Sequence, residues 1–172
     1  IIDEINRLEV ITDNMNTEMT SFCCQVMEGE LSLDQSVKSF SLIRAAAELE
    51  SIADYCHSIA SYRDRLYRKN LNFSDEGWED ILNYFKEIGS FFDDVSSYVS
   101  KESSTNTEQF FKKAKNLNEH ADRIRDSHLN RMKAGSCAPL PALTFSDMAV
   151  AMRRVKNHTV NLFETIKEVP RA

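Results

Sequence analysis

Four acidic side chains have the chemistry and the spacing to hold a cation. Glu9 and Asp13 are four residues apart, and Glu50 and Asp54 repeat the same E-x-x-x-D arrangement. Residues four apart lie on one face of a helix, where two like charges repel each other by roughly 0.2–0.5 kcal/mol. Carboxylate oxygens suit a hard or borderline metal. The two pairs are therefore a candidate site for a divalent or ferric ion such as Fe, Mn or Zn.

The alternative is that both pairs lie on solvated helix faces. Residues 1–86 carry 8 basic and 16 acidic side chains, a balance of −8, whereas residues 87–172 carry 13 and 11, a balance of +2. Acidic pairs at this spacing arise easily in such an acidic half. The net charge of −6 argues against a nucleic-acid partner, because binding to phosphates needs clustered Lys and Arg.

Basic residues in the second half of the chain are candidates for docking a partner. They are Arg153, Arg154 and Lys156, together with His128 and Arg131. Such a basic face would bind acidic loops or anionic lipid headgroups. The alternative, which we favour, is that these residues serve helix solubility and interact favourably with helix C-terminal ends.

The sequence shows no pattern that is typical of catalysis. A di-iron carboxylate enzyme would need E-x-x-H on two helices, and the nearest pair here is Asp54 and His57. A Gly-rich phosphate loop, G-x-S-x-G and H-E-x-x-H are all absent from the sequence. We predict that the protein is not an enzyme, and the alternative from that class is a carboxylate-bridged metal enzyme.

The elements that carry these residues are all expected to be helices. Apolar residues recur at steps of three and four, and only four Gly and three Pro are present to make turns. The expected helices span residues 2–28, 33–69, 75–102, 107–133 and 146–168. A loop containing Pro139 and Pro141 precedes the last one.

Each expected helix has one apolar stripe that we predict to face the core. The first two stripes are Ile5, Leu8, Thr12, Met15, Met19, Phe22 and Val26, and Leu42, Ala45, Leu49, Ile52, Cys56 and Ile59. The third is Trp78, Ile81, Phe85, Ile88, Phe92, Val95 and Val99. The last two are Phe110, Ala114, Leu117, Ala121, Ile124 and His128, and Met148, Met152, Val155, Thr159, Leu162 and Ile166.

Five helices joined by short links predict an all-α, elongated antiparallel bundle that forms one domain over residues 1–172. The chain begins with Ile1 rather than Met, and five helices do not divide into two matched sub-bundles, so we expect one more helix before it. No run of about 18 apolar residues could span a membrane. Cys23, Cys24, Cys56 and Cys137 are interpreted as reduced thiols in a cytosolic protein, with two disulfides in a secreted one as the alternative.

One segment of the second expected helix points to a family. Glu48-Leu49-Glu50-Ser51-Ile52-Ala53-Asp54 resembles the L-E-R-I-G-D signature of PhoU-type phosphate regulators, which are bacterial proteins built from two repeated three-helix bundles. Residues 31–36, 72–77, 128–132 and 152–158 are similar to the version fused to the C-terminus of bacterial Na+/phosphate cotransporters. The similarity covers nearly the whole chain in order.

The resemblance implies a PhoU-like fold of two three-helix repeats, with the first helix missing from this sequence. It implies a regulatory domain on the cytoplasmic side of the bacterial inner membrane that modulates a Na+/phosphate cotransporter. The partner would be the membrane part of the same chain, and homo-oligomers are left open. The alternatives are a free-standing PhoU-type regulator of phosphate uptake and signalling, and a metal-binding helical-bundle protein.

The resemblance also bears on the acidic pairs. PhoU proteins bind multinuclear metal clusters through E/D-x-x-x-D motifs, which implies metal binding at Glu9, Asp13, Glu50 and Asp54. The matching positions of the second repeat are Arg153 and Asn157, and neither is a carboxylate. We therefore expect no second cluster.

Overall fold

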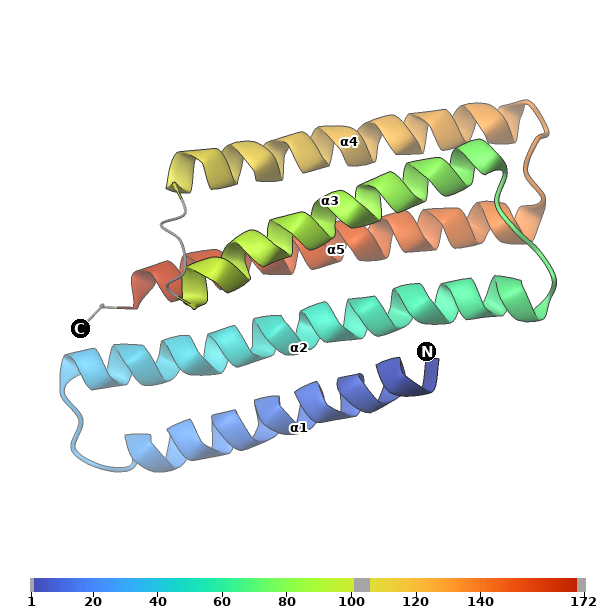
Figure 1. Ribbon diagram of the computed structural model, residues 1–172. Coiled ribbons are helices and arrows are strands. Elements are labelled where there is room, and N and C mark those ends of the chain that lie inside the picture. The colour runs from blue at the N-terminus through green and yellow to red at the C-terminus, as the bar shows by residue number, and fades with distance from the viewer. Residues whose placement is uncertain (1, 101–105, 170–172) are drawn as a thin grey trace.

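Five helices contain most of the residues that the computed structural model describes, which are 2–100 and 106–169 (Figure 1). The helices are α1 (Ile2–Met27), α2 (Leu33–Arg68), α3 (Asp75–Val99), α4 (Thr107–Lys133) and α5 (Pro139–Glu168). These residues include no strand, so the predicted all-α bundle is confirmed. The predicted end of the third helix at residue 102 lies outside the described residues.

Polar caps fix where three helices begin. Ser32 and Gln35 form a capping box at α2, because the Gln35 backbone N–H donates to Ser32 Oγ and the Ser32 N–H donates to Gln35 Oε1. The side chains of Ser74 and Asn106 cap α3 and α4 in the same sense. Gly135, with φ of 70°, follows α4 in the left-handed conformation that favours glycine.

The last helix begins earlier than its sequence predicts. We predicted a loop up to residue 145, whereas α5 begins at Pro139 and has both Pro139 and Pro141 in its first turn. The first backbone N–H groups of a helix have no partner within it, so a proline there sacrifices no hydrogen bond. Pro139 and Pro141 therefore mark the start of a helix rather than a continuous loop.

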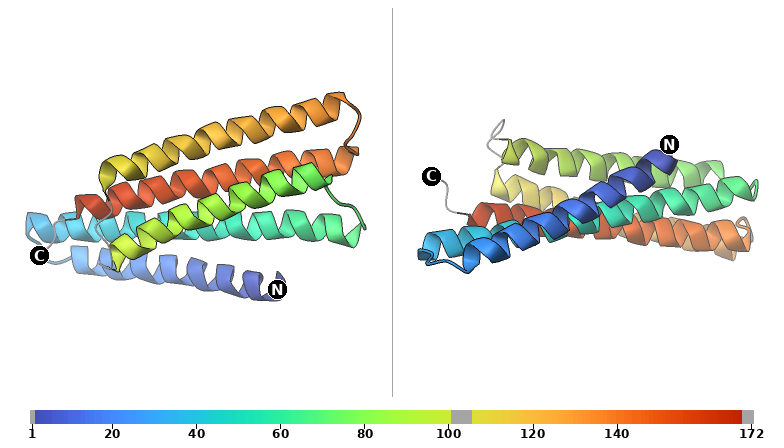
Figure 2. Two further views of the ribbon diagram at one scale, coloured as in Figure 1. Left: turned by 45° about the horizontal axis from the view of Figure 1, so that its top comes forward. Right: turned by 90° about the horizontal axis from the view of Figure 1, so that it is seen from below.

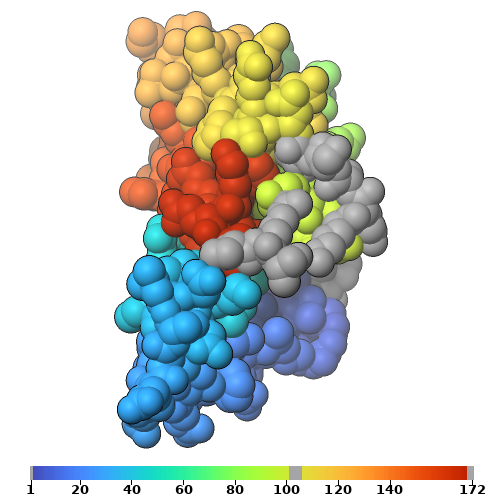
Figure 3. All heavy atoms as spheres, turned by 90° about the vertical axis from the view of Figure 1, so that its left-hand side faces the viewer, coloured from blue at the N-terminus to red at the C-terminus, as the bar shows by residue number. Residues whose placement is uncertain are grey.

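The helices form two unequal groups. α3, α4 and α5 all pack against one another, α2 packs along α5, and α1 packs against α2 only within the described residues. Figure 1 and the two further views in Figure 2 show the nearly antiparallel arrangement. Seen from the end, α4 lies at one edge of an elongated cross-section and the α1–α2 pair at the other (Figure 3). The result is a three-helix bundle joined through α5 to a two-helix hairpin.

The hydrophobic core is built mainly by α2, α3, α4 and α5. Phe110 lies between two other rings: its centroid is 4.5 Å from that of Phe91 and 4.0 Å from that of Phe163. All three rings are at most 2 % exposed. In contrast, Cys23 is the one fully buried side chain among the described residues of α1.

The predicted inward stripes of the last two helices are confirmed. All six residues predicted for α4, from Phe110 to His128, are buried. In α5, Met148, Met152, Val155, Thr159 and Leu162 are buried, and Ile166 packs against the core at its edge. Both helices have other helices packed against the side that carries their apolar stripe.

The stripes predicted for the first three helices are partly wrong. Leu8, Met15, Met19, Phe22 and Val26 of α1, Leu42, Leu49 and Cys56 of α2, and Trp78, Phe85 and Val99 of α3 are exposed. Ile5 and Thr12 of the predicted α1 stripe are partly buried, and Asn16, Thr20 and Cys23, which lie outside it, also face the protein interior. In α3, Ile81, Ile88 and Val95 are buried as predicted, and Tyr84 and Phe91, which lie outside the predicted stripe, are buried as well. An apolar stripe becomes buried only where another helix lies against it.

None of the helices in the described part of the chain is long and apolar enough to cross a bilayer. The four cysteines are free thiols, as predicted.

Candidate functional site

The structure brings three of the four predicted metal-binding carboxylates together. α1 and α2 run antiparallel (Figure 1), which places Asp13 close to the Glu50–Asp54 pair. Partial burial raises the pKa of Glu50 above its ordinary value of 4.5, and the negative charges of Asp54 and Asp13 raise it further. Glu9 is half-buried one turn before Asp13, and it is not among the charges that act on Glu50.

This grouping is not a formed metal centre. Among the described residues, no group of three or more His, Cys, Asp or Glu side chains could hold a metal ion as arranged. Ser51 Oγ donates to the Glu50 carboxylate at 3.5 Å, and burial together with the nearby negative charges raises the pKa of Glu50 despite this contact. Metal binding at Glu9, Asp13, Glu50 and Asp54 therefore stays a prediction.

The acidic cluster predicts a pH-dependent stability. Because the pKa of Glu50 is higher in the folded state, the folded protein binds more protons than the unfolded one at pH values just above 4.5, and stability falls as pH rises through this range. Glu50→Gln removes the repulsion, so it should stabilise the protein at pH 7 by roughly 0.3–0.5 kcal/mol and less at pH 4. Urea unfolding at both pH values measures this. An equal effect at both would contradict it, and Glu18→Gln on the exposed side of α1 is the control.

The predicted docking residues do not form one surface. His128 and Arg131 are buried, and Lys156 is 5 % exposed, whereas Arg153 and Arg154 are exposed. The prediction is corrected for the three buried residues, because side chains that face the interior cannot contact a partner. Arg153 and Arg154 remain accessible, and Arg153 lies 3.6 Å from Asp122 in a surface ion pair.

The buried members serve the fold. Arg131 Nη1 donates to Asp80 Oδ2 at 2.8 Å and to Ser127 Oγ at 2.7 Å, so it ties α4 to α3. His128 Nε2 lies 3.0 Å from the Ala142 carbonyl oxygen, and its ring stacks on Phe145 with a centroid distance of 4.2 Å. Burial lowers the pKa of Lys156, and the nearby charge of Arg153 lowers it further.

Because His128 is buried, we expect the protein to lose stability in mild acid. Burial lowers its pKa below the ordinary value of 6.5, and Arg131 also lowers it, although the Ala142 carbonyl acts in the opposite direction. His128 therefore binds a proton more readily in the unfolded chain than in the folded chain, and stability falls as pH drops below about 6.5. His128→Gln, which is neutral at every pH, should flatten this slope between pH 7 and 5 in urea titrations. An unchanged slope would show that other groups cause it.

A polar contact that sequence reasoning missed joins α2 to α5. His158 Nδ1 lies 2.7 Å from Glu48 Oε2, and Asn161 Nδ2 donates to both Glu48 oxygens at 3.3 Å. The Tyr55 ring stacks on His158 with a centroid distance of 5.5 Å. Glu48 and His158 are 110 residues apart, so spacing along the chain carries no signal of their contact.

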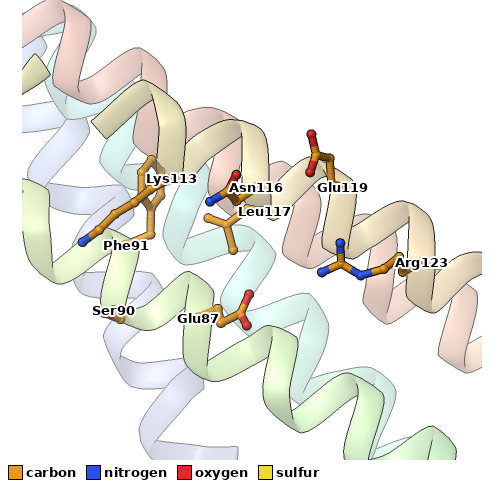
Figure 4. Close-up of a pocket in the computed structure, with 8 residues that line it drawn as sticks. All are labelled: Glu87, Ser90, Phe91, Lys113, Asn116, Leu117, Glu119 and Arg123. Atoms are coloured by element: carbon orange, nitrogen blue, oxygen red, sulfur yellow. The ribbon is translucent and has the colours of Figure 1, made fainter. Parts of the chain in front are cut away.

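A groove between α3 and α4, with a volume of about 420 Å³, is lined by charges of both signs (Figure 4). Glu87 is paired with His120 at 2.7 Å, and Lys113 with Asp94 at 2.5 Å. None of the predicted site residues lines the groove. Its charges are largely satisfied by partners within the bundle, so we assign no chemistry to it.

Comparisons with models of protein families, with curated proteins and with solved structures found no match. The interpretation of the chain therefore rests on its own residues and their geometry.

Proposed function

We propose that this chain is a non-catalytic, PhoU-like regulatory domain that modulates a Na+/phosphate cotransporter. It would act on the cytoplasmic side of the bacterial inner membrane, with the membrane part of its own transporter chain as partner. Changes in the packing of the helices would transmit the phosphate status of the cell to the membrane part.

The observation that carries this proposal is the contact between two of the segments that resemble the family. Glu48 opens the segment that resembles the PhoU signature, and His158 closes the segment 152–158 in the second half of the chain. The structure packs these segments against each other through the Glu48–His158 contact at 2.7 Å. When Glu50 is matched with Arg153, Ile52 is matched with Val155, and both of these apolar side chains are buried. This supports an internal repeat whose halves meet at α2 and α5.

Deleting the domain from the full transporter chain tests the proposal. We expect phosphate uptake to continue but to lose its dependence on intracellular phosphate, because transport would lie in the membrane part and regulation in this domain. Glu48→Gln with His158→Gln in the intact chain is a milder test, since it alters the α2–α5 contact alone. Unchanged uptake kinetics together with an unchanged response to phosphate would refute the proposal.

The acidic cluster favours a second candidate, a metal-binding helical-bundle protein. A metal that binds the folded state alone raises its stability by about 2.7 kcal/mol at a hundredfold excess over Kd. We expect such an increase in Tm with Fe, Mn or Zn in the wild type, and its loss in Asp13→Asn combined with Asp54→Asn. An unaltered Tm with all three metals would remove this candidate and the metal prediction together.

A further inference from the structure

A small cavity lies at the end of the bundle where α4 ends and where α3 and α5 begin (Figure 1). We name it the end cavity, and its lining residues lie in the segments 72–77, 128–131 and 136–145. Its volume of about 40 Å³ is roughly three times the 10–15 Å³ that one water needs. Asn72 and Ser136, which both line it, are exposed. The end cavity is therefore open to a small solute.

Arg131 brings an unused donor to the end cavity. Its Nη1 donates to Asp80 and Ser127, whereas its Nη2 is buried and has no partner among the described residues. The side chain is only 9 % exposed, and a buried charged donor without an acceptor is costly. A methyl group placed on Gly77 would lie 3.6 Å from Nη2, so this nitrogen lies beside another residue that lines the cavity. Arg131 thus lacks an acceptor on that side.

His128 brings the opposite kind of group to the end cavity. Its Nε2 lies 3.0 Å from the Ala142 carbonyl oxygen, and because a carbonyl oxygen can only accept, Nε2 carries the proton. Burial lowers the pKa of His128, so the ring is neutral at pH 7 and Nδ1 has a free lone pair. Nδ1 is buried and has no partner in the described part of the chain. His128 thus lacks a donor, just as Arg131 lacks an acceptor.

The surroundings of the end cavity favour a negative charge. None of the described residues that line it is acidic. The first turns of α3 and α5 meet there, and the N-terminal end of each helix has the effect of roughly half a positive charge. Asp75 and Glu76 offset this charge at α3, whereas α5 has neither a side-chain cap nor an acidic residue in its first turn. A small anion would therefore be stabilised by α5 as well as by Arg131.

We infer that the end cavity binds a small oxyanion that still carries a hydroxyl group, such as hydrogen phosphate or bicarbonate. One oxygen of the anion would accept from Arg131 Nη2, and its O–H would donate to His128 Nδ1. A charge-assisted hydrogen bond of the first kind is about twice as strong as a neutral one. Sulfate has no proton to donate at neutral pH, so it would leave Nδ1 without a partner. The inference goes beyond the proposed function, because it depends on the groups in this cavity and not on a transporter.

Isothermal titration calorimetry of the whole chain tests the inference, with sodium phosphate, bicarbonate and sulfate compared at neutral pH and equal ionic strength. We expect a millimolar or tighter Kd for phosphate, for bicarbonate or for both. Sulfate should bind roughly tenfold more weakly or worse, because it leaves a buried acceptor unpaired. Binding of neither hydroxyl-bearing anion would overturn the inference and leave the cavity to water. Sulfate binding as tight as that of the better of the two would overturn it as well.

Arg131→Lys locates the bound anion. Lys keeps the positive charge, but its single ammonium group cannot pair with Asp80 and also replace Nη2 in the cavity. We expect it to weaken binding of the anion roughly tenfold or more. Arg125→Lys is the matched control on the same helix, because Arg125 is 61 % exposed and pairs with surface acids, and it should leave binding unchanged. An equal loss in both variants would contradict the site.

Two glycines of α3 give a second pair of variants that leaves the Arg131–Asp80 pair in place. Gly77→Ala puts a methyl group 3.6 Å from Arg131 Nη2 and so narrows the space that the anion would occupy. Gly89→Ala is its control, because nothing lies within 4 Å of the added methyl group. Alanine favours a helix more than glycine does, so both variants should fold. We expect Gly77→Ala alone to weaken binding, and wild-type affinity in this variant would overturn the inference.

Discussion

Phe163→Ala should lower the free energy of unfolding by about 3–5 kcal/mol, because truncating a buried phenylalanine removes its transfer energy and leaves a cavity. Phe163 is fully buried in α5, and its ring stacks on Phe110 with a centroid distance of 4.0 Å. It also packs against Tyr98 of α3 at 5.1 Å. One substitution therefore loosens the contacts among α3, α4 and α5, where the three-helix bundle is joined.

Chemical denaturation with urea, followed by circular dichroism, measures this loss. Phe40→Ala on α2 is the control, since Phe40 is 59 % exposed, and such a surface change should alter stability by about 0.5 kcal/mol or less. A loss below about 1 kcal/mol for Phe163→Ala would mean that this ring is not packed as the structure shows.

Arg131→Met should cost about 2–4 kcal/mol, because removing one partner of a largely buried ion pair leaves the other charge unpaired. Arg131 is 9 % exposed, and its guanidinium both donates to Asp80 at 2.8 Å and lies 5.2 Å from the centroid of the Phe145 ring. Met keeps most of the side-chain volume but none of the donors. The loss therefore reports the polar contacts between α4 and α3 rather than a cavity.

A double variant separates the unpaired charge from lost packing. Adding Asp80→Asn to Arg131→Met removes the stranded carboxylate, so part of the stability should return, and the two changes should be non-additive. Arg125→Met is the control, because Arg125 is 61 % exposed and pairs with surface acids; its cost should be about 0.5 kcal/mol or less. Full additivity of Arg131→Met and Asp80→Asn would contradict the ion pair.

The sequence predicts helices better than it predicts which side of each helix is buried. The stripes of α4 and α5 face inwards because both helices have neighbours there. The stripes of α1 and α3 are equally regular, yet Met15 and Phe85 are exposed. Periodicity states which residues would suit a neighbour, and only the tertiary arrangement decides whether one is present.

The candidate site was predictable within one helix and not between helices. The E-x-x-x-D spacing correctly places Glu50 beside Asp54, because residues four apart share a helix face. The approach of Asp13 depends on how α1 pairs with α2, and the Glu48–His158 contact depends on how α2 crosses α5. The burial of Arg131 and Lys156 was missed for the same reason. A cationic side chain is predicted to be exposed from its residue type, and only a neighbouring helix can bury it.

The isolated position of α1 has a consequence for how the protein opens. Within the part of the chain that the structure describes, α1 packs against α2 alone and contributes one fully buried side chain, so detaching it exposes little additional apolar surface. Its amide hydrogens should therefore exchange with solvent through a local opening, well before those of α5. α1 would then open and close as a local unit while the other four helices stay folded.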